Sequence, residues 1–477
     1  MDETVAEPEE TRHPSKIHFS YGCGSFLDDF LLTAFSVRVY AFYENEVLLP
    51  NIFLAMAFVI YGVWNMFNDP LVGYISDRPT RLTARWGRRF PWFMLTAIPC
   101  AVVFTFIFTP PLGFDWAVFA WLVVFICLYD FLYSFWNTNW LATFPVKFRS
   151  HHERTRVAGI QTIFSQVGLT LGMLLPPLFF TYGDRASYIV QALVVTAAGA
   201  VMATFMIPAM REARAPPSSS SPLSSPASLP ASKASDMVPD VTGARRSYFK
   251  TLLFALRQKN FVAYLVAYLG QTVAQVVLLA SVPYLVKFVL HAEADMEILI
   301  SGALLAGGVV MVPFWVRFSR RRGNRLGYII GTGSIAAVLV PFLFVQDLSF
   351  AIAGAFILGM ALSAPWTLMA PTFSDVIDEM VVKMKSRNEG IFYGFRTFFG
   401  RLSVVIQALT FGIIHAISGF DPDAAVQASI ALWGLRVQMM AVPALFYLAG
   451  CLCMWRVFDI TPEKARSTKA GLAALGL

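Results

Sequence analysis

Apolar runs long enough to cross a lipid bilayer recur along the whole chain. A helix needs about 20 apolar residues to span the hydrocarbon core, and twelve runs of that order are found, at residues 19–43, 51–76, 90–109, 115–143, 156–181, 187–210, 258–289, 296–317, 326–346, 349–373, 389–418 and 432–457. The chain is 57% hydrophobic and 14% charged, so in water it would expose large apolar patches that lipid would cover. This pattern predicts an all-α membrane protein with twelve transmembrane helices.

Positive charge falls in alternate loops between these runs. The loops after the second, fourth, eighth and tenth runs carry basic clusters, namely Arg78, Arg81, Arg85, Arg88, Arg89, Lys147, Arg149, Arg154, Arg156, Arg320, Arg321, Arg322, Arg325, Lys383, Lys385 and Arg387. By the positive-inside rule these loops and both termini face the cytoplasm, which predicts a multi-pass protein of the cell membrane. Orientation also explains the net charge of +7 without a nucleic-acid partner, because no basic face is interleaved with aromatic residues.

The composition changes abruptly in the middle of the chain. Residues 211–244 are rich in Ser, Pro and Ala and hold no aromatic residue, so they cannot bury enough surface to fold. We expect a flexible cytoplasmic linker that divides the chain into a tail, a six-helix half, the linker, a second six-helix half and a tail, at residues 1–18, 19–210, 211–250, 251–460 and 461–477. Two such halves are typical of alternating-access transporters, which bind a small-molecule substrate near the midplane of the bilayer. A monomer is expected.

Motifs of known enzyme classes are missing from the sequence. No HExxH, Walker loop, nucleophile elbow or dinucleotide fingerprint is present. The five cysteines are odd in number and lack the paired spacing of metal ligands, which favours a packing role. We therefore expect neither an enzyme nor a resident cofactor. A membrane sensor that transports nothing stays open as an alternative.

Asp69 is a carboxylate inside the apolar run 51–76. A charge in such a run costs roughly 2.5–3.5 kcal/mol to insert, and by default it marks an ion or substrate path. Asn65 lies one helical turn earlier on the same face, and Asn68 lies beside Asp69. The three side chains predict a cluster of oxygen ligands inside the membrane, with a paired structural charge as the alternative.

Four motifs give the chain a resemblance to a known family. They are Tyr21-Gly22-Cys23-Gly24 followed by Asp29, Asn68-Asp69-Pro70 followed by Gly73 and Asp77, Glu153-Arg154-Thr155-Arg156, and Asp375-Val376-Ile377-Asp378 followed by Arg387, Glu389 and Gly390. In this order and spacing they resemble the glycoside-pentoside-hexuronide:cation symporters of the major facilitator superfamily, the group that contains the melibiose permease. The resemblance implies the major facilitator fold and symport of a sugar, glycoside or uronide with Na⁺ or H⁺.

The resemblance places the coupling cation in the second run. The carboxylates and the neighbouring amide of the family correspond to Asn65, Asn68 and Asp69, so the first family carboxylate is an amide here. The loss of one charge weakens a Na⁺ site, because hard cations prefer anionic oxygen ligands, whereas Asp69 can still bind a proton. Na⁺ coupling, H⁺ coupling and uncoupled transport all stay open.

The resemblance also implies substrate contacts in the first and fourth runs. Asp29 matches the sugar-binding carboxylate of the family, and Trp140 matches its stacking tryptophan. Trp136 stands where the family has a second sugar-binding carboxylate. A related branch of the fold carries lipids, so the lost carboxylate keeps a lysophospholipid or another amphiphile as the alternative cargo.

Arg401 matches the basic residue that the family places near the cation and the sugar, and Arg396 lies about a turn and a half earlier. At ~1.5 Å per residue, Arg401 is about 18 Å into its run and near the midplane. Its planar guanidinium suits an anionic group on the substrate, or a salt bridge to Asp29 or Asp69. Both interpretations stay open.

Charges of both signs at the cytoplasmic ends of the two halves predict a gate. The candidates are Asp77, Arg78, Arg88, Glu153, Arg154, Asp375, Asp378, Arg387 and Glu389. Pairs that form in only one conformation bias the equilibrium between conformations. Positive-inside topology explains the arginines but not the acids beside them.

Four other polar residues within the runs have plainer interpretations. Arg38 is expected to snorkel to the membrane interface. Asp28 cannot face the same way as Asp29 and is expected to be structural. Asp130 is interpreted as a polar partner within the bundle, and His415 as an isolated residue near a helix end.

Overall fold

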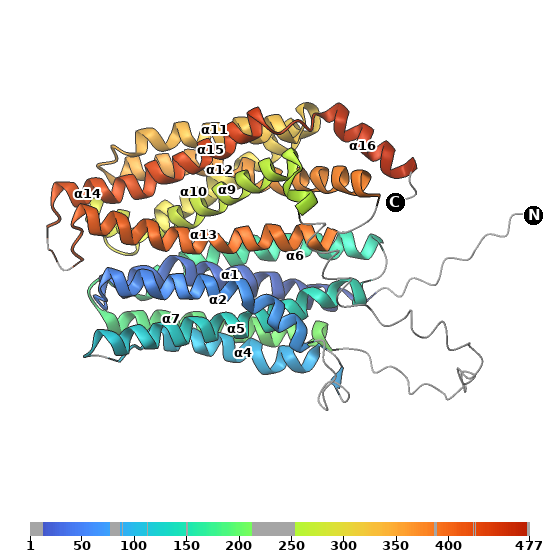
Figure 1. Ribbon diagram of the computed structural model, residues 1–477. Helices are drawn as coiled ribbons and strands as arrows, with labels where there is room; N and C mark the ends of the chain where they lie inside the picture. Colours follow the sequence, from blue (N-terminus) through green and yellow to red (C-terminus); the bar gives the residue numbers. More distant parts are fainter. Residues whose placement is uncertain are drawn as a thin grey trace, which may run out of the picture.

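Long helices form nearly all of the described chain (Figure 1). The computed structural model describes residues 13–76, 86–87, 89–111, 113–148, 151–211, 253–385, 389–422, 424 and 426–474. The first half holds α1 (Ser15–Asn45), α2 (Asn51–Ser76), α4 (Phe90–Ile107), α5 (Asp115–Lys147), α6 (His151–Leu174), the 3₁₀ turn η1 (Pro176–Phe179) and α7 (Arg185–Met210). The second half holds α9 (Lys259–Tyr284), η3 (Leu285–Val289), α10 (Met296–Arg322), α11 (Asn324–Phe342), α12 (Leu348–Met384), α13 (Glu389–Ser418), α14 (Ser429–Arg436), η4 (Val437–Ala441), α15 (Val442–Arg456) and α16 (Pro462–Ala474). The elements η3 and η4 are π-helical turns that continue α9 and join α14 to α15.

Eleven segments of the described chain are long and apolar enough to cross a membrane. The helix α1 is not among them, although its 31 residues are long enough to span a bilayer. It carries Asp28, Asp29, Arg38 and Glu44, and most of its residues are buried inside the bundle. Together with α1, the eleven segments account for the twelve spanning helices that the apolar runs predict.

Two segments differ from the prediction at the ends of helices. The helix α12 continues to Met384, well beyond the predicted end at residue 373, because its extension buries one apolar face made of Val376, Ile377, Met380 and Val381. Residues predicted to be a tail form α16, which contacts α12. Ala465 and Leu472 of α16 pack against the core of the second half.

In the described part of the chain, the most extensive contacts between the two halves are those of α2 with α13, α1 with α9, and α6 with α10. Gly62 lies where α2 crosses α13, and a Cβ atom at this position would lie 2.3 Å from Cγ2 of Val405. Glycine therefore permits an approach that any larger residue would prevent. Small residues at helix contacts have this role in membrane proteins.

Two glycines set α6 directly against the main chain of α1. Cβ atoms at Gly168 and Gly172 would lie 2.4 Å and 2.7 Å from the carbonyl oxygens of Phe26 and Phe30. The two glycines are one turn apart and face the same helix. They allow α6 to hold α1 in the middle of the bundle, where the site residues of α1 lie.

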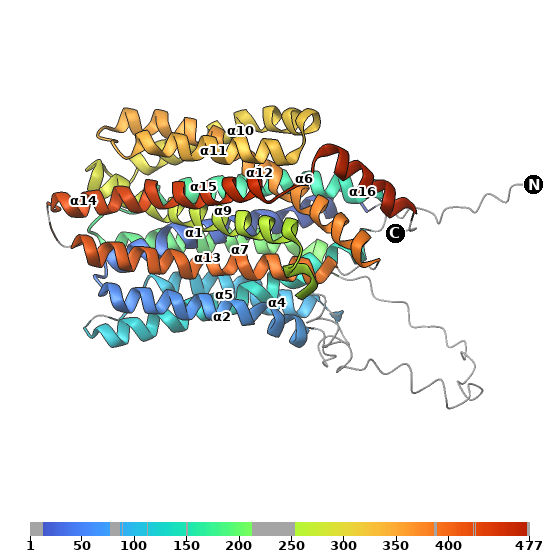
Figure 2. The same ribbon diagram turned by 45° about the horizontal axis from the view of Figure 1, so that its top comes forward.

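The two ends of the bundle differ in what they carry. We call the end at which α1 begins and α15 ends the terminal end, and the end at which α1 ends and α2 begins the far end. The helix α16 lies at the terminal end and α14 at the far end, on the right and left of Figure 1, and Figure 2 shows the same separation after rotation.

Candidate functional site

Two amides and a carboxylate meet between α2 and α5. Asn68 Nδ2 donates to Asp130 Oδ2 at 2.8 Å, to the Asp130 carbonyl at 3.0 Å and to Ser134 Oγ at 3.0 Å. Asn65 Nδ2 donates to the other carboxylate oxygen of Asp130. The four side chains are buried, and the Oδ1 atoms of both amides have no hydrogen-bond partner within the described part of the chain. Buried oxygens that lack a donor are suited to a hard cation.

Asp69 follows Asn68 directly in α2. Its side chain lies outside the described residues, so its role as the cation ligand stays a prediction. The carboxylate that the structure does place with Asn65 and Asn68 is Asp130 of α5. The sequence predicts that Asp130 is a polar partner within the bundle, but it does not predict which residues Asp130 contacts.

A second polar cluster lies halfway along α1. Tyr133 OH and Asn137 Nδ2 of α5 both donate to Asp28 Oδ1, the latter at 2.8 Å. Arg401 of α13 acts electrostatically on Asp28 and on Tyr133. The first half thus supplies a carboxylate, a phenol and an amide, and the second half supplies a guanidinium. This arrangement can bind a solute that carries several hydroxyl groups, because it offers donors and acceptors together.

Tyr61 connects the two polar clusters. It lies within electrostatic reach of both Asp130 and Arg401. Tyr61 is buried in α2.

Asp28 and Asp29 face different helices. Ser165 Oγ of α6 donates to Asp29, so Asp29 is held inside the first half. Adjacent residues point about 100° apart on a helix, and this turn directs Asp28 towards α5 and Arg401. Arg401 thus acts on Asp28, whereas the predicted substrate contact is Asp29. Its contact with substrate stays a prediction.

The two tryptophans of α5 pack inside the first half. Trp136 and Trp140 are 0% and 2% exposed. Trp140 Nε1 donates to the Tyr21 carbonyl at 3.2 Å, and its indole fills the space beside Gly24, where a Cβ atom would lie 2.2 Å away. In this conformation both indoles serve as core, and their predicted contact with substrate is not tested.

Arg396 is held by aromatic rings of its own half. Its guanidinium lies 4.6 Å from the ring centroid of Tyr268 and 5.3 Å from that of Phe373. Cations over aromatic faces are stabilised by the ring quadrupole. Packing of α13 against α9 and α12 explains this position, and the predicted substrate contact of Arg396 stays a prediction.

Six ionisable side chains from both halves meet at the far end. We call them the far-end lock: Arg38, Glu44, Glu46, Lys287, Glu297 and His415. Arg38 forms an ion pair with Glu297. Lys287 Nζ lies 2.9 Å from Glu46 Oε1, and His415 Nδ1 lies 2.5 Å from Glu44 Oε1. Each pair joins one half to the other, so the lock holds the far end closed.

Phenols and main-chain groups complete the hydrogen bonds of the lock. Tyr284 OH donates to Glu44, and Tyr182 OH donates to Glu297. Gly183 N donates to Glu46 Oε2 at 2.8 Å. The π-helical turn η3 carries Lys287, which also donates to the Asn45 carbonyl at 3.3 Å. Inserted π turns are frequent at functional sites.

The lock overturns two interpretations made from the sequence. Arg38 does not snorkel to the interface, because it is 2% exposed and is paired with Glu297, which is fully buried. His415 is not isolated, because it is paired with Glu44. Both errors have the same cause: each partner lies in the other half, hundreds of residues away in the sequence.

Two residues of the predicted gate at the terminal end, Glu153 and Asp375, have hydrogen-bond partners within their own halves. His18 Nε2 and His13 Nδ1 lie 2.8 Å and 3.1 Å from Glu153 Oε1. Burial opposes the ionisation of this carboxyl, but these hydrogen bonds hold the pKa of Glu153 below its ordinary value. Asp375 accepts from Asn324 Nδ2 at 2.8 Å, and Asp378 lies one turn later in α12. The remaining gate predictions fall outside the described residues, namely Asp77, Arg78, Arg88, Arg387 and the side chains of Arg154 and Glu389.

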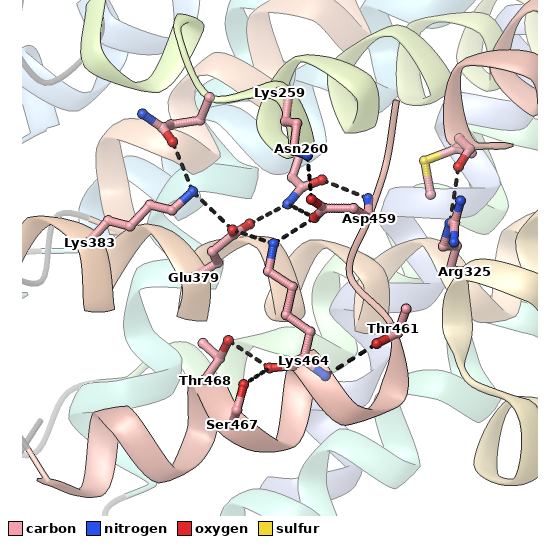
Figure 3. Close-up of polar contacts among 12 residues, drawn as sticks. Lys259, Asn260, Arg325, Glu379, Lys383, Asp459, Thr461, Lys464, Ser467 and Thr468 are labelled. Atoms are coloured by element: carbon pink, nitrogen blue, oxygen red, sulfur yellow. Dashed lines mark hydrogen bonds and ion pairs between the residues drawn. The ribbon is translucent and has the colours of Figure 1, made fainter. Parts of the chain in front are cut away.

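A larger network at the terminal end ties together α9, α12, α16 and the segment before α16 (Figure 3). Glu379 Oε1 lies 2.9 Å from both Lys383 Nζ and Lys464 Nζ. Asn260 Nδ2 donates to Glu379 Oε2 at 2.6 Å and to Asp459 Oδ1 at 2.7 Å. Lys464 and Lys259 each lie 2.5 Å from Asp459. All of these residues belong to the second half, so the network fixes that half internally.

Sequence reasoning missed Asp28, Asp130, Tyr61 and Asn137 as members of the central site. One signal was available, because Asp28 and Asp130 are carboxylates inside apolar runs, as Asp69 is. The far-end lock also has a signal in hindsight. Glu297 and Lys287 of the second half are ionisable residues in apolar runs, and their signs complement those of Arg38 and Glu46.

Comparisons with known proteins agree along nearly the whole chain. The family model described as MFS/sugar transport protein matches residues 20–462. The chain is 24% identical over 461 residues to a putative sulfoquinovose importer of Salmonella typhimurium, with 93% of this chain and 90% of that protein covered. It is 21% identical over 491 residues to sodium-dependent lysophosphatidylcholine symporter 1 of Xenopus tropicalis, with 94% and 86% covered. Its fold is similar to the crystal structure of a D-xylose-proton symporter, with a TM-score of 0.62, 14% identity, and 93% of this chain and 98% of that chain covered.

Proposed function

Because the chain belongs to the MFS/sugar transport protein family, we propose that it carries a sugar or glycoside across the cell membrane together with Na⁺ or H⁺, by alternating access. The family assignment and the structural likeness confirm the major facilitator fold expected from the sequence. In the proposed orientation the terminal end faces the cytoplasm. Exposed arginines at the end of α10 support this orientation, namely Arg317, Arg320, Arg321 and Arg322.

The observation that supports sugar as cargo is the polar cluster shared by the halves. Asp28 and Asn137 lie on one side, and Arg401 lies on the other. A sugar hydroxyl can donate to the carboxylate and accept from the guanidinium or the amide. A solute bound in this way contacts both halves at once, as alternating access requires.

The observation that supports coupling is the buried cluster of Asn65, Asn68, Asp130 and Ser134. Its two unpartnered amide oxygens and its carboxylate are the ligands that Na⁺ prefers. In this proposal Asp130 supplies the charge that is lost where Asn65 replaces the first carboxylate of the family. Asp69 of the same α2 face is the second candidate for the charge, and either carboxylate can instead carry H⁺.

Ligand-induced stabilisation tests the substrate class. The full-length protein is heated with a neutral sugar such as D-xylose, with sulfoquinovose as a sulfonated sugar, or with a lysophospholipid, each with and without Na⁺. A ligand that binds only the folded state raises Tm as its concentration exceeds Kd. A rise with sugars that grows in Na⁺ supports the proposal. No response to any sugar, together with a response to lysophospholipid, would reject it.

Arg401→Gln tests how the sugar is held. Because Arg401 acts electrostatically on Asp28, we expect the variant to weaken neutral and anionic sugars alike, by tenfold or more, since the buried carboxylate loses a nearby cation. Binding of D-xylose and sulfoquinovose to the variant and the parent is compared by calorimetry. Loss confined to sulfoquinovose would show instead that Arg401 recognises an anionic group of the substrate.

Two single substitutions test the coupling site. Asp130→Asn and Asp69→Asn are each expected to abolish uptake against a gradient while leaving exchange of substrate, because the sugar contacts lie elsewhere. Ser134→Ala is the matched control, since it removes one hydrogen bond of the cluster and no charge. Uptake and exchange are measured in proteoliposomes under a Na⁺ or a pH gradient. Undiminished uphill uptake by Asp130→Asn would exclude Asp130 as a coupling residue.

A second candidate cargo is an amphiphile of the lysophospholipid class. The specific observation is an apolar cavity lined by Met173 of α6 in the first half and by residues of the second half, namely Gln275, Leu278, Leu279, Val282, Leu285, Ile300, Ser301, Leu304, Phe342, Ala355, Leu358, Leu362, Trp366 and Met439. Such a lining suits a hydrocarbon chain. Ala355→Phe fills the cavity and is expected to abolish binding of a lysophospholipid but to leave sugar binding unchanged. Equal binding of lysophospholipid by the variant and the parent would exclude the cavity as its site.

A further inference from the structure

The far-end lock is balanced in charge only if it holds a proton. Its acids are Glu44, Glu46 and Glu297, which are 0%, 4% and 0% exposed. Only two of its bases, Arg38 and Lys287, are cations at every working pH. The third base is His415, which is 1% exposed and is charged only when protonated. With neutral His415 the closed lock would bury one uncompensated negative charge, which a protein interior strongly disfavours.

The contacts locate this proton on one pair. Glu297 is matched by Arg38, and Glu46 is matched by Lys287. The third carboxylate, Glu44, faces His415 Nδ1 at 2.5 Å, and no water separates atoms at this distance. Either the imidazole is protonated and pairs with the carboxylate, or Glu44 is protonated and donates to the imidazole. Both forms hold one proton between the same two side chains.

The surroundings offer no other charge to balance Glu44 among the described neighbours. Tyr284 of α9 and Tyr40 of α1 are phenols beside Glu44 and stay neutral near pH 7. Tyr182 and Tyr188 of the first half are phenols on Glu297 and Glu46. The apolar rings of Phe411 and Phe420 pack on His415. Arg185 is exposed, and its guanidinium binds the main-chain oxygen of Glu46 rather than a carboxylate of the lock.

We propose that Glu44 and His415 form a proton-binding site, and that closing the far end takes up one proton from the solution on that side. When the halves separate there, water reaches both side chains. The two side chains are then hydrated separately, and the proton that they share in the closed form is released to that solution. The inference rests on the proposed alternating access. It differs from coupling at Asp69 or Asp130, because this proton returns to the solution from which it came.

The sign and size of the effect follow from linkage. The closed form binds one proton more than the open form, so acidification favours the closed far end. One proton changes the ratio of closed to open molecules by at most tenfold per pH unit. The site therefore sets the conformation of the carrier by the pH of the solution facing the far end.

The test follows the opening of the far end with two spin labels. Labels are attached at Ile52→Cys of α2 and Ile430→Cys of α14, two exposed positions in opposite halves, in full-length protein without the native cysteines. The protein is placed in nanodiscs without substrate and at fixed Na⁺, and distances are measured from pH 5.5 to 8.5. In the parent, the fraction at the short distance is expected to fall as pH rises.

Variants of Glu44 and His415 are expected to change the pH profile of the parent in different ways. Glu44→Gln removes the uncompensated acid, so the far end should stay closed at pH 8 and should open on acidification, when a cationic His415 becomes the excess charge. Glu44→Gln combined with His415→Gln should be closed and independent of pH. His291→Gln is the matched control, because His291 is an exposed histidine of the same end and is expected to leave the parent profile unchanged.

Two results would overturn the proposal. One is a parent in which the short-distance fraction does not change with pH, a result that needs no variant to fold. The other is a pH profile of Glu44→Gln that equals that of the parent. The spin-label distances are measured without substrate and without transport. The test can therefore be interpreted even if the protein is not a symporter, and a distance that does not change with pH does not bear on the proposed cargo.

Discussion

The two ends of the bundle use their buried charges in different ways. At the far end, Arg38, Glu44 and Glu46 each pair with a residue of the opposite half. At the terminal end, Glu153 and Glu379 pair with residues of their own half. Among the described residues, the buried charges of the far end therefore join the two halves, whereas Glu153 and Glu379 at the terminal end stabilise each half internally. The difference indicates which contacts must break during transport and which must persist.

The ion pairs of the two ends also differ in their contribution to the free energy, because they differ in burial. Removing one partner of a buried ion pair costs about 3–5 kcal/mol, because the other charge remains uncompensated. Pairs near the surface contribute about 0–1 kcal/mol. The Arg38 and Glu297 side chains are 2% and 0% exposed, while Lys259 and Asp459 at the terminal end are 62% and 39% exposed. Substitutions at the far end should therefore have large effects on conformation. Substitutions at the terminal end should have smaller effects, on stability.

The largest effect is expected for Arg38→Met. This change leaves Glu297 buried without its cation and should disfavour the closed far end by about 3–5 kcal/mol, enough to make the open form predominate. The spin-label distance between positions 52 and 430 measures the shift. The double variant Arg38→Met with Glu297→Gln should restore most of the closed form, because Gln can still accept from Tyr182. A single variant that stays closed would show that this pair does not hold the halves together.

A smaller effect, of another kind, is expected for Glu379→Gln. Glu379 is 7% exposed, and its carboxylate receives Lys383, Lys464 and Asn260. Hydrogen bonds to a charged group contribute about 1.5–3 kcal/mol, so thermal unfolding should occur at a lower temperature. The far-end distance should not change, because all of these partners lie in the second half. A changed far-end distance would contradict the conclusion that this network stabilises only the second half.

The smallest effect is expected for Lys259→Ala, which should cost less than about 1 kcal/mol because this lysine is largely exposed. Hydrogen exchange of the α16 amides should therefore remain close to that of the parent. Lys464→Ala is the comparison, since Lys464 contacts Glu379 as well as Asp459. Faster exchange in Lys259→Ala than in Lys464→Ala would reverse the ranking of the two lysines.

The docking of α16 should also resist acid. Burial opposes the ionisation of Asp459, but hydrogen bonds from Lys259, Lys464 and Asn260 lower its pKa well below the ordinary value of 3.8. A lowered pKa stabilises the folded form above the ordinary value, and this stabilisation is lost only as the pH falls below it. Exchange of the α16 amides should thus be steady from pH 8 to about 4 after correction for intrinsic rates. Undocking near pH 6 would contradict this.

The helices could be predicted from the sequence because apolar length is a local property. The run predicted at 51–76 matches α2, and that at 389–418 matches α13. The end of α12 and the helix α16 could not be predicted in this way, because each is stabilised by burying one apolar face on the other segments of the second half. Tertiary contacts decide such helix ends, and a scan of hydropathy does not contain them.

The sequence predicts individual polar side chains of the site but not which residues they contact. Asn65 and Asn68 stand out because they lie near Asp69 in one run, and the structure brings both to a buried carboxylate. Which carboxylate receives them depends on how α2 packs on α5. Likewise, the choice between Asp28 and Asp29 as the residue facing Arg401 depends on the rotation of α1 about its axis, which the two adjacent aspartates do not reveal.

The continuity of α1 has a mechanical consequence. Asp28 of the central cluster and Arg38 of the lock lie ten residues apart on this one helix, about 15 Å at ~1.5 Å per residue. A rod of that length tilted by about 10° moves its end by roughly 2–3 Å, as far as is needed to part a hydrogen-bonded pair. In the proposed function, a solute that binds Asp28 and tilts α1 would thus separate the ion pairs of the far-end lock, and no relay of intervening side chains is required.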